Sequence, residues 1–476
     1  MHLIVLLCFF LNLLDPAEVL NPKRKRFFQK NVEATTPAFA NETAGTRCSP
    51  APKLRFQPVF EGPTNDRQKA VVRAFQHAWM GYKKYAWGHD ELKPVSKSYE
   101  NPFELGLTIV DSLDTAVIMG LKTETREAID WIRDSLDVSP DRSVNLFETT
   151  IRVLGGLLSG YHLTGEAILL KKAKILGDNL LFAFTKSKSP IPKSDVNLQS
   201  GSAFSPNQGL SSLSEATTLQ LEFRDLAILT GNSTYENVAF GASEHIHKIG
   251  CKQTGGLCPY FIDDNGNLKS TDITLGARAD SYYEYLLKQW LQTKKSIDWL
   301  RDDFLESVNS IREILYRSSA SSSLKFIGEV QTSGEFYPKM DHLVCFFAGT
   351  LVLSHQNGLD TKQGDHLEMA KQLGHVCHKM YENPTGLGPE IAHFNMETSS
   401  EEDIYSLDSH SLLRPEAIEA WFYLYRATND KKYQEWGWSA FEAIEKYAKV
   451  ETGGYSSIDN VFKIKVKRRS IDTSAG

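Results

Sequence analysis

Five short polar links recur at similar intervals along the chain. They contain Thr164, Thr230, Thr293, Asn357 and Thr428, so their spacings are 66, 63, 64 and 71 residues. Apolar residues between the links fall three or four apart, which is the spacing of an amphipathic helix. A period of this length holds two helices with their loops, and stacked hairpins bury faces that one hairpin cannot bury alone. The sequence therefore predicts an all-α fold of stacked helical hairpins.

Composition and charge exclude several function classes. The 476 residues are 41% hydrophobic and 24% charged, which suffices for a buried core. The net charge is −6, and the strong basic runs at 23–26 and 465–469 lie near the two ends, so no nucleic-acid partner is expected. There is no Gly-x-Ser-x-Gly elbow and no glycine-rich phosphate loop after a strand, which argues against serine-hydrolase and nucleotide chemistry.

Residues 1–62 are expected to be an apolar leader followed by a stalk. Residues 3–14 are almost all apolar, but a bilayer span takes about 20 residues. The run suits the apolar region of a signal peptide, although no Lys or Arg precedes it, and a clipped anchor is an equal alternative. Membrane contact is therefore expected only through a possible N-terminal anchor.

The six cysteines are typical of a secretory chain with few disulfides. Cys251 and Cys258 bracket a glycine-rich loop and could pair locally. Cys345 and Cys377 each fall in a helical stretch and could join two helices. No cysteine spacing matches a zinc site.

A carboxylate opens the first helix of each predicted hairpin. These acids are Glu148, Glu215, Asp280, Asp341 and Glu416, each 12 to 16 residues before its polar link. If the hairpins close into a ring, the first helices run the same way and their acids converge at one mouth. The helix dipole by itself favours an acid in a first turn, so each acid also has a purely structural explanation.

Arginines accompany three of these acids, which the dipole does not explain. Residues 275–290 contain one such pair and are predicted to form a helix, because their apolar residues recur at helical spacing. Carboxylates accept hydrogen bonds from sugar hydroxyls, arginines donate them, and aromatic faces cover sugar C–H surfaces. A carbohydrate site is therefore one interpretation, and a salt-bridge network that only stabilises the fold is the other. The pairs are Glu148 with Arg152, Asp280 with Arg278, and Glu416 with Arg414.

Eight stretches of the chain, in order, resemble the class I α-1,2-mannosidases, glycoside hydrolase family 47. The resemblance covers residues from about 65 to 461. It implies an (α/α)7 barrel, which agrees with the hairpin period. It also implies removal of α-1,2-linked mannose from high-mannose N-glycans of glycoproteins in the lumen of the endoplasmic reticulum or early Golgi, with inversion and bound calcium. The stretches are 99–121, 145–157, 214–223, 276–287, 340–349, 386–391, 413–425 and 453–461.

The resemblance implies roles for individual residues as well. Glu148 is expected to be the general acid, acting through a water, Glu416 the favoured base, and Asp280 a partner in acid/base work. Inversion needs room for a water, so acid and base should lie about 6.5–9.5 Å apart. Cys345 and Cys377 match the disulfide of the family. The residues expected to line the sugar site or to hold its carboxylates are Arg152, Glu215, Arg278, Glu284, His342, Glu390, Arg414 and Glu419.

Two of these residues carry a further expectation. Arginine at the position of Arg278 is characteristic of family members of the endoplasmic reticulum that trim one mannose, whereas Golgi members carry a smaller residue there. For His342, a hydrogen bond to a neighbour within the core is an alternative to a role at the sugar site.

The chain departs from the family after residue 461. Family members continue with a helix that completes the ring and with an Asn-Thr-Glu segment whose threonine binds calcium. Residues 462–476 are a short basic tail that matches neither. We therefore expect a leader and stalk at 1–62, a catalytic domain at 63–461, a tail at 462–476, and a ring that is incomplete at the C-terminal end, with no metal ligand among the residues named above.

Two other function classes remain open at this point. An inactive, lectin-like relative would bind mannose glycans without hydrolysing them. A purely structural helical toroid would explain the helices but not the pairs of acids and arginines. Calcium-dependent release of mannose discriminates among the three.

The unmatched tail predicts weak calcium binding. Calcium takes six to eight oxygen ligands, and distant carboxylates cannot replace a missing threonine without moving. We expect the 476-residue chain to bind calcium weakly or not at all and to release little mannose, whereas a form extended with the family's C-terminal helix and Asn-Thr-Glu segment should do both. Calorimetry with calcium and mannose release from a high-mannose glycan measure this. Full binding and activity in the 476-residue form would contradict the prediction.

Overall fold

The fold is described from a computed structural model of the whole chain. It describes residues 59–251, 254–361, 365–397, 402–464 and 468–469. The expected leader, most of the stalk and most of the basic tail lie outside the described residues. Within the described ranges, no helix combines the length and the apolar character that crossing a membrane requires.

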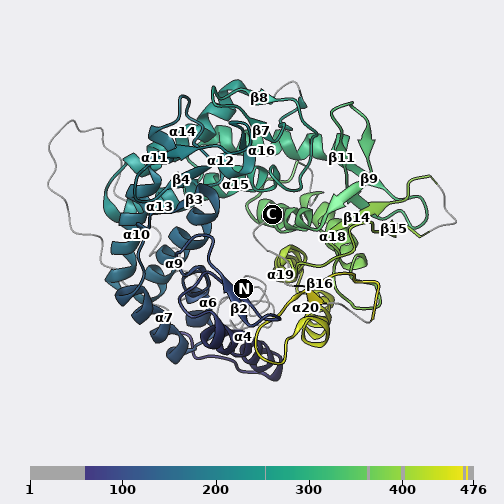
Figure 1. Ribbon diagram of the computed structural model, residues 1–476. Coiled ribbons are helices and arrows are strands. Elements are labelled where there is room, and N and C mark those ends of the chain that lie inside the picture. The colour runs from purple at the N-terminus through teal and green to yellow at the C-terminus, as the bar shows by residue number, and fades with distance from the viewer. Residues whose placement is uncertain (1–58, 252–253, 362–364, 398–401, 465–467, 470–476) are drawn as a thin grey trace.

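Helical hairpins follow one another around a ring, as the polar links predicted (Figure 1). The first helices of successive hairpins contact one another in chain order from α6 to α19. Figure 1 shows α9, α15 and α19 toward the centre, with α7 and α10 on the outside. These first helices are α5 (Leu107–Asp111) with α6 (Leu113–Ile118), α9 (Gly155–Thr164), α13 (Gln220–Thr230), α15 (Asp280–Gln292), α17 (Phe346–Gln356) and α19 (Glu416–Thr428).

The second helix of each hairpin packs on the first and carries an exposed polar face. Helix α4 (Asp66–Tyr85) precedes the first hairpin. It lies beside α20, as an ion pair between Arg67 and Glu435 at 2.6 Å indicates. The first and last long helices of the described chain are therefore neighbours in the ring. The second helices are α7 (Lys122–Asp134), α10 (Ala167–Leu180), α14 (Thr234–Ile249), α16 (Asp298–Ser310), α18 (Asp365–Lys379) and α20 (Lys432–Ala443), and α11 (Phe182–Thr185) follows α10.

The polar links end the first helices for a backbone reason. Gly165 and Asn429, which directly follow two of these helices, have φ values of 72° and 57°. This left-handed conformation caps a helix, and glycine and asparagine tolerate it best. The links at these positions are therefore helix stops, and the hairpin period predicted from them is confirmed.

Three first helices are less regular than the sequence predicted. The chain enters them through short helical turns, and in one of the three through a stretch of π-helix, before the long α-helix begins. Wide π-turns interrupt the regular hydrogen-bond ladder and are frequent at functional sites. These entry segments are α8 (Leu146–Glu148) with the π-helix η1 (Thr149–Leu154), α12 (Leu213–Thr217), and the 3-10 helix η4 (His342–Cys345); two further π-helices, η3 (Ile311–Leu315) and η5 (Ile444–Ala448), end α16 and α20.

The helix predicted over 275–290 begins only at Asp280, so the prediction was wrong for its first five residues. Arg278 has φ 76°, which no regular helix contains. Gly276 packs so closely on Asp341 that a Cβ atom there would lie 2.1 Å from Asp341 Oδ2. Periodicity could not reveal this, because the loop is fixed by a contact with a residue 65 positions away in the chain.

Short antiparallel sheets join the hairpins. Residues 328–336 carry the clearest strand pattern of the sequence, and they lie largely in the hairpin of β11 (Glu329–Val330) and β12 (Phe336–Tyr337). The other strands have two to four residues each, too few to give a periodic pattern, and were not predicted. They are β1 (Glu91–Lys93), β2 (Ser98–Glu100), β3 (Ser143–Asn145), β4 (Asp195–Asn197), β5 (Ala203–Phe204), β6 (Ser211–Ser212), β7 (Phe261–Ile262), β8 (Leu268–Lys269), β9 (Tyr316–Ser318), β10 (Lys325–Ile327), β13 (Lys339–Asp341), β14 (Ile391–Phe394), β15 (Ile404–Tyr405), β16 (Ser457–Ile458) and β17 (Arg468–Arg469).

One buried carboxylate organises the approach to the first hairpin. Asp90 is fully buried and accepts four backbone N–H bonds from residues 103–107, at 2.6 to 3.1 Å. A buried charge is tolerated only where hydrogen bonds replace its water. The loop that leads into α5 therefore depends on this side chain.

Two disulfides are present among the described residues. Cys345 in η4 is bonded to Cys377 in α18, which confirms the pairing implied by the family resemblance. Cys251 and Cys258 are also bonded, so the local pairing considered for them is confirmed. The first bridge spans 32 residues and the second spans 7.

The longer bridge should contribute more to stability. In the chain-entropy account, closing a loop of this length restricts the unfolded chain by roughly 3–4 kcal/mol, and a seven-residue loop restricts it less. We expect the double variant Cys345→Ser/Cys377→Ser to lower the free energy of unfolding by about 3 kcal/mol, and Cys251→Ser/Cys258→Ser to lower it less. Urea unfolding of the three proteins measures this. Peptide mapping that finds Cys345 and Cys377 as free thiols in folded protein would contradict it.

Candidate active site

Glu148 lies at the end of α8, at the mouth of the ring. Asn145 caps this turn, since its side chain accepts a hydrogen bond from the Glu148 N–H at 2.8 Å. One turn later, Arg152 Nε lies 2.6 Å from Glu148 Oε2. Both side chains are largely buried, at 18% and 28% exposed. The acid and arginine that the sequence paired are therefore in direct contact.

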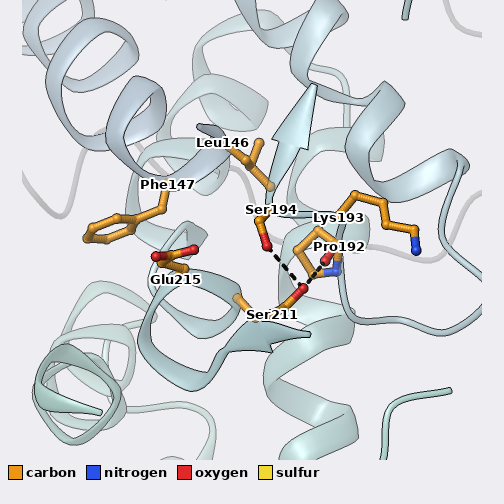
Figure 2. Close-up of a pocket in the computed structure, with 8 residues that line it drawn as sticks. Leu146, Phe147, Pro192, Lys193, Ser194, Ser211 and Glu215 are labelled. Carbon is orange, nitrogen blue, oxygen red and sulfur yellow. Dashed lines mark hydrogen bonds between the residues drawn. The ribbon is translucent and has the colours of Figure 1, made fainter. Parts of the chain in front are cut away.

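Glu215 lies next to this pair, in α12. Ser212 caps its helix by accepting from the Glu215 N–H at 3.2 Å. Burial raises the pKa of Glu215, a hydrogen bond from Asn145 lowers it, and the charge of Glu148 raises it again. Figure 2 shows Glu215 beside Phe147 at a small pocket. The pocket is lined by Leu146, Phe147, Pro192, Lys193, Ser194, Ser211, Glu215 and Ala216.

Arg278 is the exposed arginine of this group. Its backbone has φ 76°, and its carbonyl accepts a hydrogen bond from Ser214 N–H at 2.9 Å. Its guanidinium lies over the ring of Phe261, 4.9 Å from the ring centroid, and its charge lowers the pKa of Glu215. Arg278 is therefore held at the mouth by a strained backbone and by an aromatic face.

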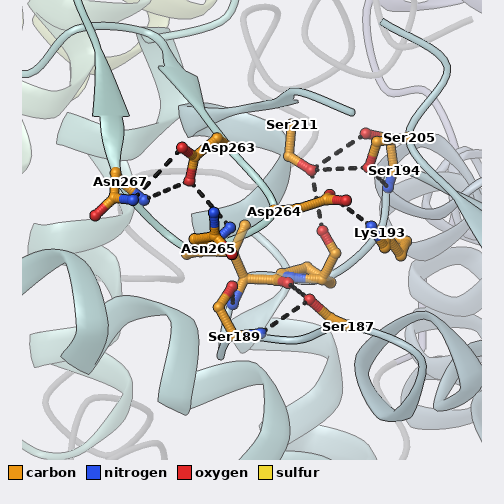
Figure 3. A network of polar contacts seen from close by, with 12 residues as sticks. Ser187, Ser189, Lys193, Ser194, Ser205, Ser211, Asp263, Asp264, Asn265 and Asn267 are labelled. Atoms are coloured by element: carbon orange, nitrogen blue, oxygen red, sulfur yellow. Dashed lines mark hydrogen bonds and ion pairs between the residues drawn. The ribbon is translucent and has the colours of Figure 1, made fainter. Parts of the chain in front are cut away.

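The hairpin that carries Phe261 is itself tethered (Figure 3). Lys193 Nζ forms an ion pair with Asp264 Oδ1 at 2.5 Å, which joins the segment before β4 to the turn between β7 and β8. Asp263 closes that turn by accepting the N–H groups of Asn265 and Asn267. The wall beside Arg278 is thus assembled from two segments far apart in the sequence.

Asp280 begins α15 and faces the other acids. Its Oδ1 accepts the Ser281 N–H at 2.7 Å. Burial, together with the nearby charges of Glu284 and Glu416, raises the pKa of Asp280 to about 7. A carboxyl with a pKa near neutrality can both hold and release a proton at physiological pH.

Glu416 begins α19 and contacts His342. His342 Nδ1 lies 3.1 Å from Glu416 Oε2, and the imidazole is 2% exposed. The alternative considered from the sequence, a hydrogen bond between His342 and a neighbour, is therefore present, and the neighbour is a candidate catalytic acid.

Glu390 and Arg414 hold the segment that leads to Glu416. Arg414 Nε donates to Glu390 Oε2 at 2.5 Å, and the Leu412 N–H donates to Glu390 Oε1 at 3.0 Å. The Glu390 carbonyl accepts the His342 N–H at 2.8 Å. Burial lowers the pKa of Arg414, but the charge of Glu390 and its hydrogen bond raise it above its usual value.

Glu284 and Glu419 share one lysine inside the ring. Lys288, one turn after Glu284 on α15, forms a close ion pair with it. Burial would lower the pKa of Lys288, but Glu284 and Glu419 raise it above its usual value. Burial, Glu284 and Glu416 in turn raise the pKa of Glu419, and Lys288 lowers it. Asp280 and Glu416, which were predicted from helix starts, thus lie close to Glu284 and Glu419, which the family resemblance implied.

Three functional candidates were missed by the sequence analysis. Lys288 follows Glu284 at helical spacing, so its position on the same face could have been found. Glu222 lies two turns after Glu215; its pKa is raised to about 8 by burial, and its Oε2 is buried without a hydrogen bond. Tyr381, whose hydroxyl lies 2.8 Å from His342 Nε2, is in a turn after α18 and gave no signal in the sequence.

Within the described ranges, the acids of the ring interior do not converge in threes on one point. Calcium prefers carboxylate and carbonyl oxygens, which the ring interior offers. Cations of the chain already neutralise several of these carboxylates, however, and no three of them converge within the described residues. The described ranges contain one converging set, Asp360, Asp365 and His366. There Arg312 pairs with Asp365 at 3.2 Å, and the start of α18 disfavours a cation, so this set is poorly suited to calcium.

The raised pKa of Asp280 predicts a pH-dependent stability. The carboxyl titrates at 3.8 in the unfolded chain and near 7 in the folded chain, so its contribution is complete below pH 4 and lost as the pH rises through 7. Asp280→Asn removes this loss. Allowing for partial solvent exposure, the variant should be more stable than the wild type by roughly 1–2 kcal/mol at pH 8 and equal to it below pH 4.

Urea unfolding of chelator-treated wild-type and Asp280→Asn protein at several pH values measures this difference. A stability difference that does not change with pH would contradict the raised pKa.

Known proteins are similar to this chain in sequence and in fold. An endoplasmic reticulum mannosyl-oligosaccharide 1,2-alpha-mannosidase of Rattus norvegicus is 49% identical over 406 residues, which are 84% of this chain and 61% of the relative. A mannosyl-oligosaccharide 1,2-alpha-mannosidase of Candida albicans is 42% identical over 420 residues, 83% of this chain and 74% of that protein. The chain thus spans about three fifths of the length of the mammalian relatives.

The structural similarity agrees with the sequence similarity. The solved alpha-1,2-mannosidase from Trichoderma reesei matches with a TM-score of 0.76 and 27% identity, covering 83% of this chain and 87% of that one. The model of Glycosyl hydrolase family 47 matches residues 74–474, a range that reaches into the basic tail. The chain therefore belongs to glycosyl hydrolase family 47.

Proposed function

We propose that this chain hydrolyses terminal α-1,2-linked mannose from high-mannose N-glycans of glycoproteins in the lumen of the endoplasmic reticulum. The observation that carries the proposal is the set of acids at the starts of the first helices, gathered at one mouth of the ring, of which Glu148 and Glu416 are each held by a named partner. Membership of the family and the activity for which its relatives are named support the same function.

The proposed chemistry divides the acid and base work among three carboxyls. Glu148, held by Arg152, protonates the leaving oxygen through a water. Glu416, held by His342, removes a proton from the attacking water. Asp280 lies near the charge of Glu416 and has a pKa near neutrality. It can therefore take up or release a proton during either the acid or the base step. An inverting reaction follows from an acid and a base on opposite sides of the scissile bond.

The experiment that tests the proposal is mannose release followed by proton NMR. The first product should be the β-anomer of mannose, because the α-linkage is inverted. Retention of glycan on the protein without release would support the lectin-like alternative instead. Calcium dependence enters the proposal from the family alone, and chelation with EDTA before the assay tests it.

In a form of the protein that releases mannose, Glu148→Gln should abolish most turnover while the fold persists. Glutamine keeps the shape of the side chain but cannot donate the proton, and general acid catalysis contributes roughly 10²–10⁴-fold. The kcat on a high-mannose glycan measures the loss. Glu166→Gln is the matched control, because Glu166 pairs with Arg126 at 3.3 Å on the outside of the ring. Turnover near the wild-type value in folded Glu148→Gln would remove Glu148 from the mechanism.

Arg278→Leu should broaden trimming. The guanidinium is exposed at the mouth and offers five donors in a planar fork, which suits one fixed glycan branch. We expect an active form of the protein to stop mainly after one mannose and its Arg278→Leu variant to remove several, as measured by mass spectrometry of the glycan products. Arg126→Leu, in the outer layer, is the control. An unchanged product distribution in Arg278→Leu would refute the role of this side chain.

A further inference from the structure

Tyr381 completes a chain of hydrogen bonds that ends on Glu416. Its hydroxyl lies 2.8 Å from His342 Nε2, and His342 Nδ1 lies 3.1 Å from Glu416 Oε2. The three residues come from the turn after α18, from η4 and from the start of α19. Two hydrogen bonds thus connect three separate segments of the ring.

The direction of these hydrogen bonds follows from the chemistry of the end groups. An ionised carboxylate only accepts hydrogen bonds, so His342 Nδ1 must carry the proton that it donates to Glu416. In a neutral imidazole the other nitrogen is then an acceptor, so the Tyr381 hydroxyl donates to Nε2. The hydroxyl thereby selects the Nδ1–H tautomer.

The surroundings hold both rings in place. A Cβ atom on Gly388 would lie 2.7 Å from the Tyr381 ring and 2.9 Å from the His342 ring, so the glycine lets both rings pack on its backbone. The Tyr381 ring also meets Trp421 edge to face, with centroids 5.3 Å apart. These contacts leave the Tyr381 hydroxyl little freedom to turn away from His342.

The disulfide binds the two halves of this arrangement together. Cys345 is three residues after His342, and Cys377 is four residues before Tyr381. The bridge therefore fixes the distance between the segments that carry the two rings.

We propose that Tyr381 is a positioning residue that fixes the tautomer of His342 and, through it, the orientation and charge of the Glu416 carboxylate. This inference rests on the proposed function only where it assigns Glu416 as the base. The hydrogen-bond chain itself stands on geometry.

Burial raises the pKa of Tyr381 far above its usual value, and the charges of Glu416 and Glu390 add to this, so its hydroxyl remains a donor across the working pH range.

Several charged and titratable groups act on the Glu416 carboxylate and must stay unchanged in a test. The charged and titratable groups that face Glu416 are His342 from η4, Tyr381 from the turn after α18, Asp280 from α15, and Arg414 and Glu419 from its own segment.

Tyr381→Phe removes only the hydroxyl and keeps the ring. His342 can then place its proton on Nε2, which turns an Nδ1 lone pair toward the carboxylate and weakens the ionised base. We expect the acid limb of the kcat/KM profile to move up by about one pH unit and kcat to fall about ten-fold, less than the roughly 10⁴-fold loss when a triad loses its orienting carboxylate.

The matched control is Tyr235→Phe. The Tyr235 hydroxyl also donates to a carboxylate, that of Asp178, but it does so between α14 and α10 in the outer layer. This variant should lose stability to a similar degree without moving the pH profile. An acid limb that moves equally in both variants would overturn the proposal, because it would show a general effect of destabilisation.

Nitrogen-15 NMR of the histidine rings tests the tautomer without reference to activity. The wild type should show an Nδ1–H signal that disappears in His342→Gln, and Tyr381→Phe should shift that ring toward the Nε2–H form. A wild-type His342 in the Nε2–H form, or a tautomer unchanged in Tyr381→Phe, would overturn the proposal even if the mutant folds poorly. If the tautomer responds but the wild type releases no mannose, the proposed function fails and the hydrogen-bond chain stands.

Discussion

A carboxylate taken into the interior of a ring must be matched by a cation or a hydrogen-bond donor. An unpaired buried charge costs several kcal/mol, so gathering acids at one mouth is feasible only if each has a partner. The chain supplies these partners from the same helix, from the next segment, or from across the ring. The pairs are Glu148 with Arg152, Glu284 with Lys288, Glu390 with Arg414, and Glu416 with His342.

Not every acid is matched in full, and the remainder suits catalysis. The pKa of Asp280 rises to about 7 because burial and two neighbouring carboxylates disfavour its charge. The raised pKa lowers the stability of the folded chain near neutral pH, but it allows the Asp280 carboxyl to take up or release a proton there. Helix starts place the acids, while short sheets and strained loop residues such as Arg278 place the groups between them. The regular helices of the ring therefore position the acids, and the irregular segments at its rim position the groups between them.

The helical architecture was predictable because it depends on local sequence patterns, namely the helical spacing of apolar residues and the polar links between helices. Polar links at regular intervals gave the hairpins, and the left-handed residues at Gly165 and Asn429 are their structural cause. The start of α15 was not predictable, since a contact between Gly276 and Asp341 decides where that helix begins. The short strands were not predicted, because two to four residues are too few to show a periodic pattern.

The sequence by itself determined the all-α hairpins, the acids at their starts, and, through resemblance, the family and its candidate site residues. Only the tertiary structure decided which groups touch: that His342 bonds Glu416, that Phe261 covers Arg278, and that Tyr381 reaches His342. Helical periodicity reports the environment of one segment. Contacts between segments depend on how the ring closes, and no local pattern of residues records that.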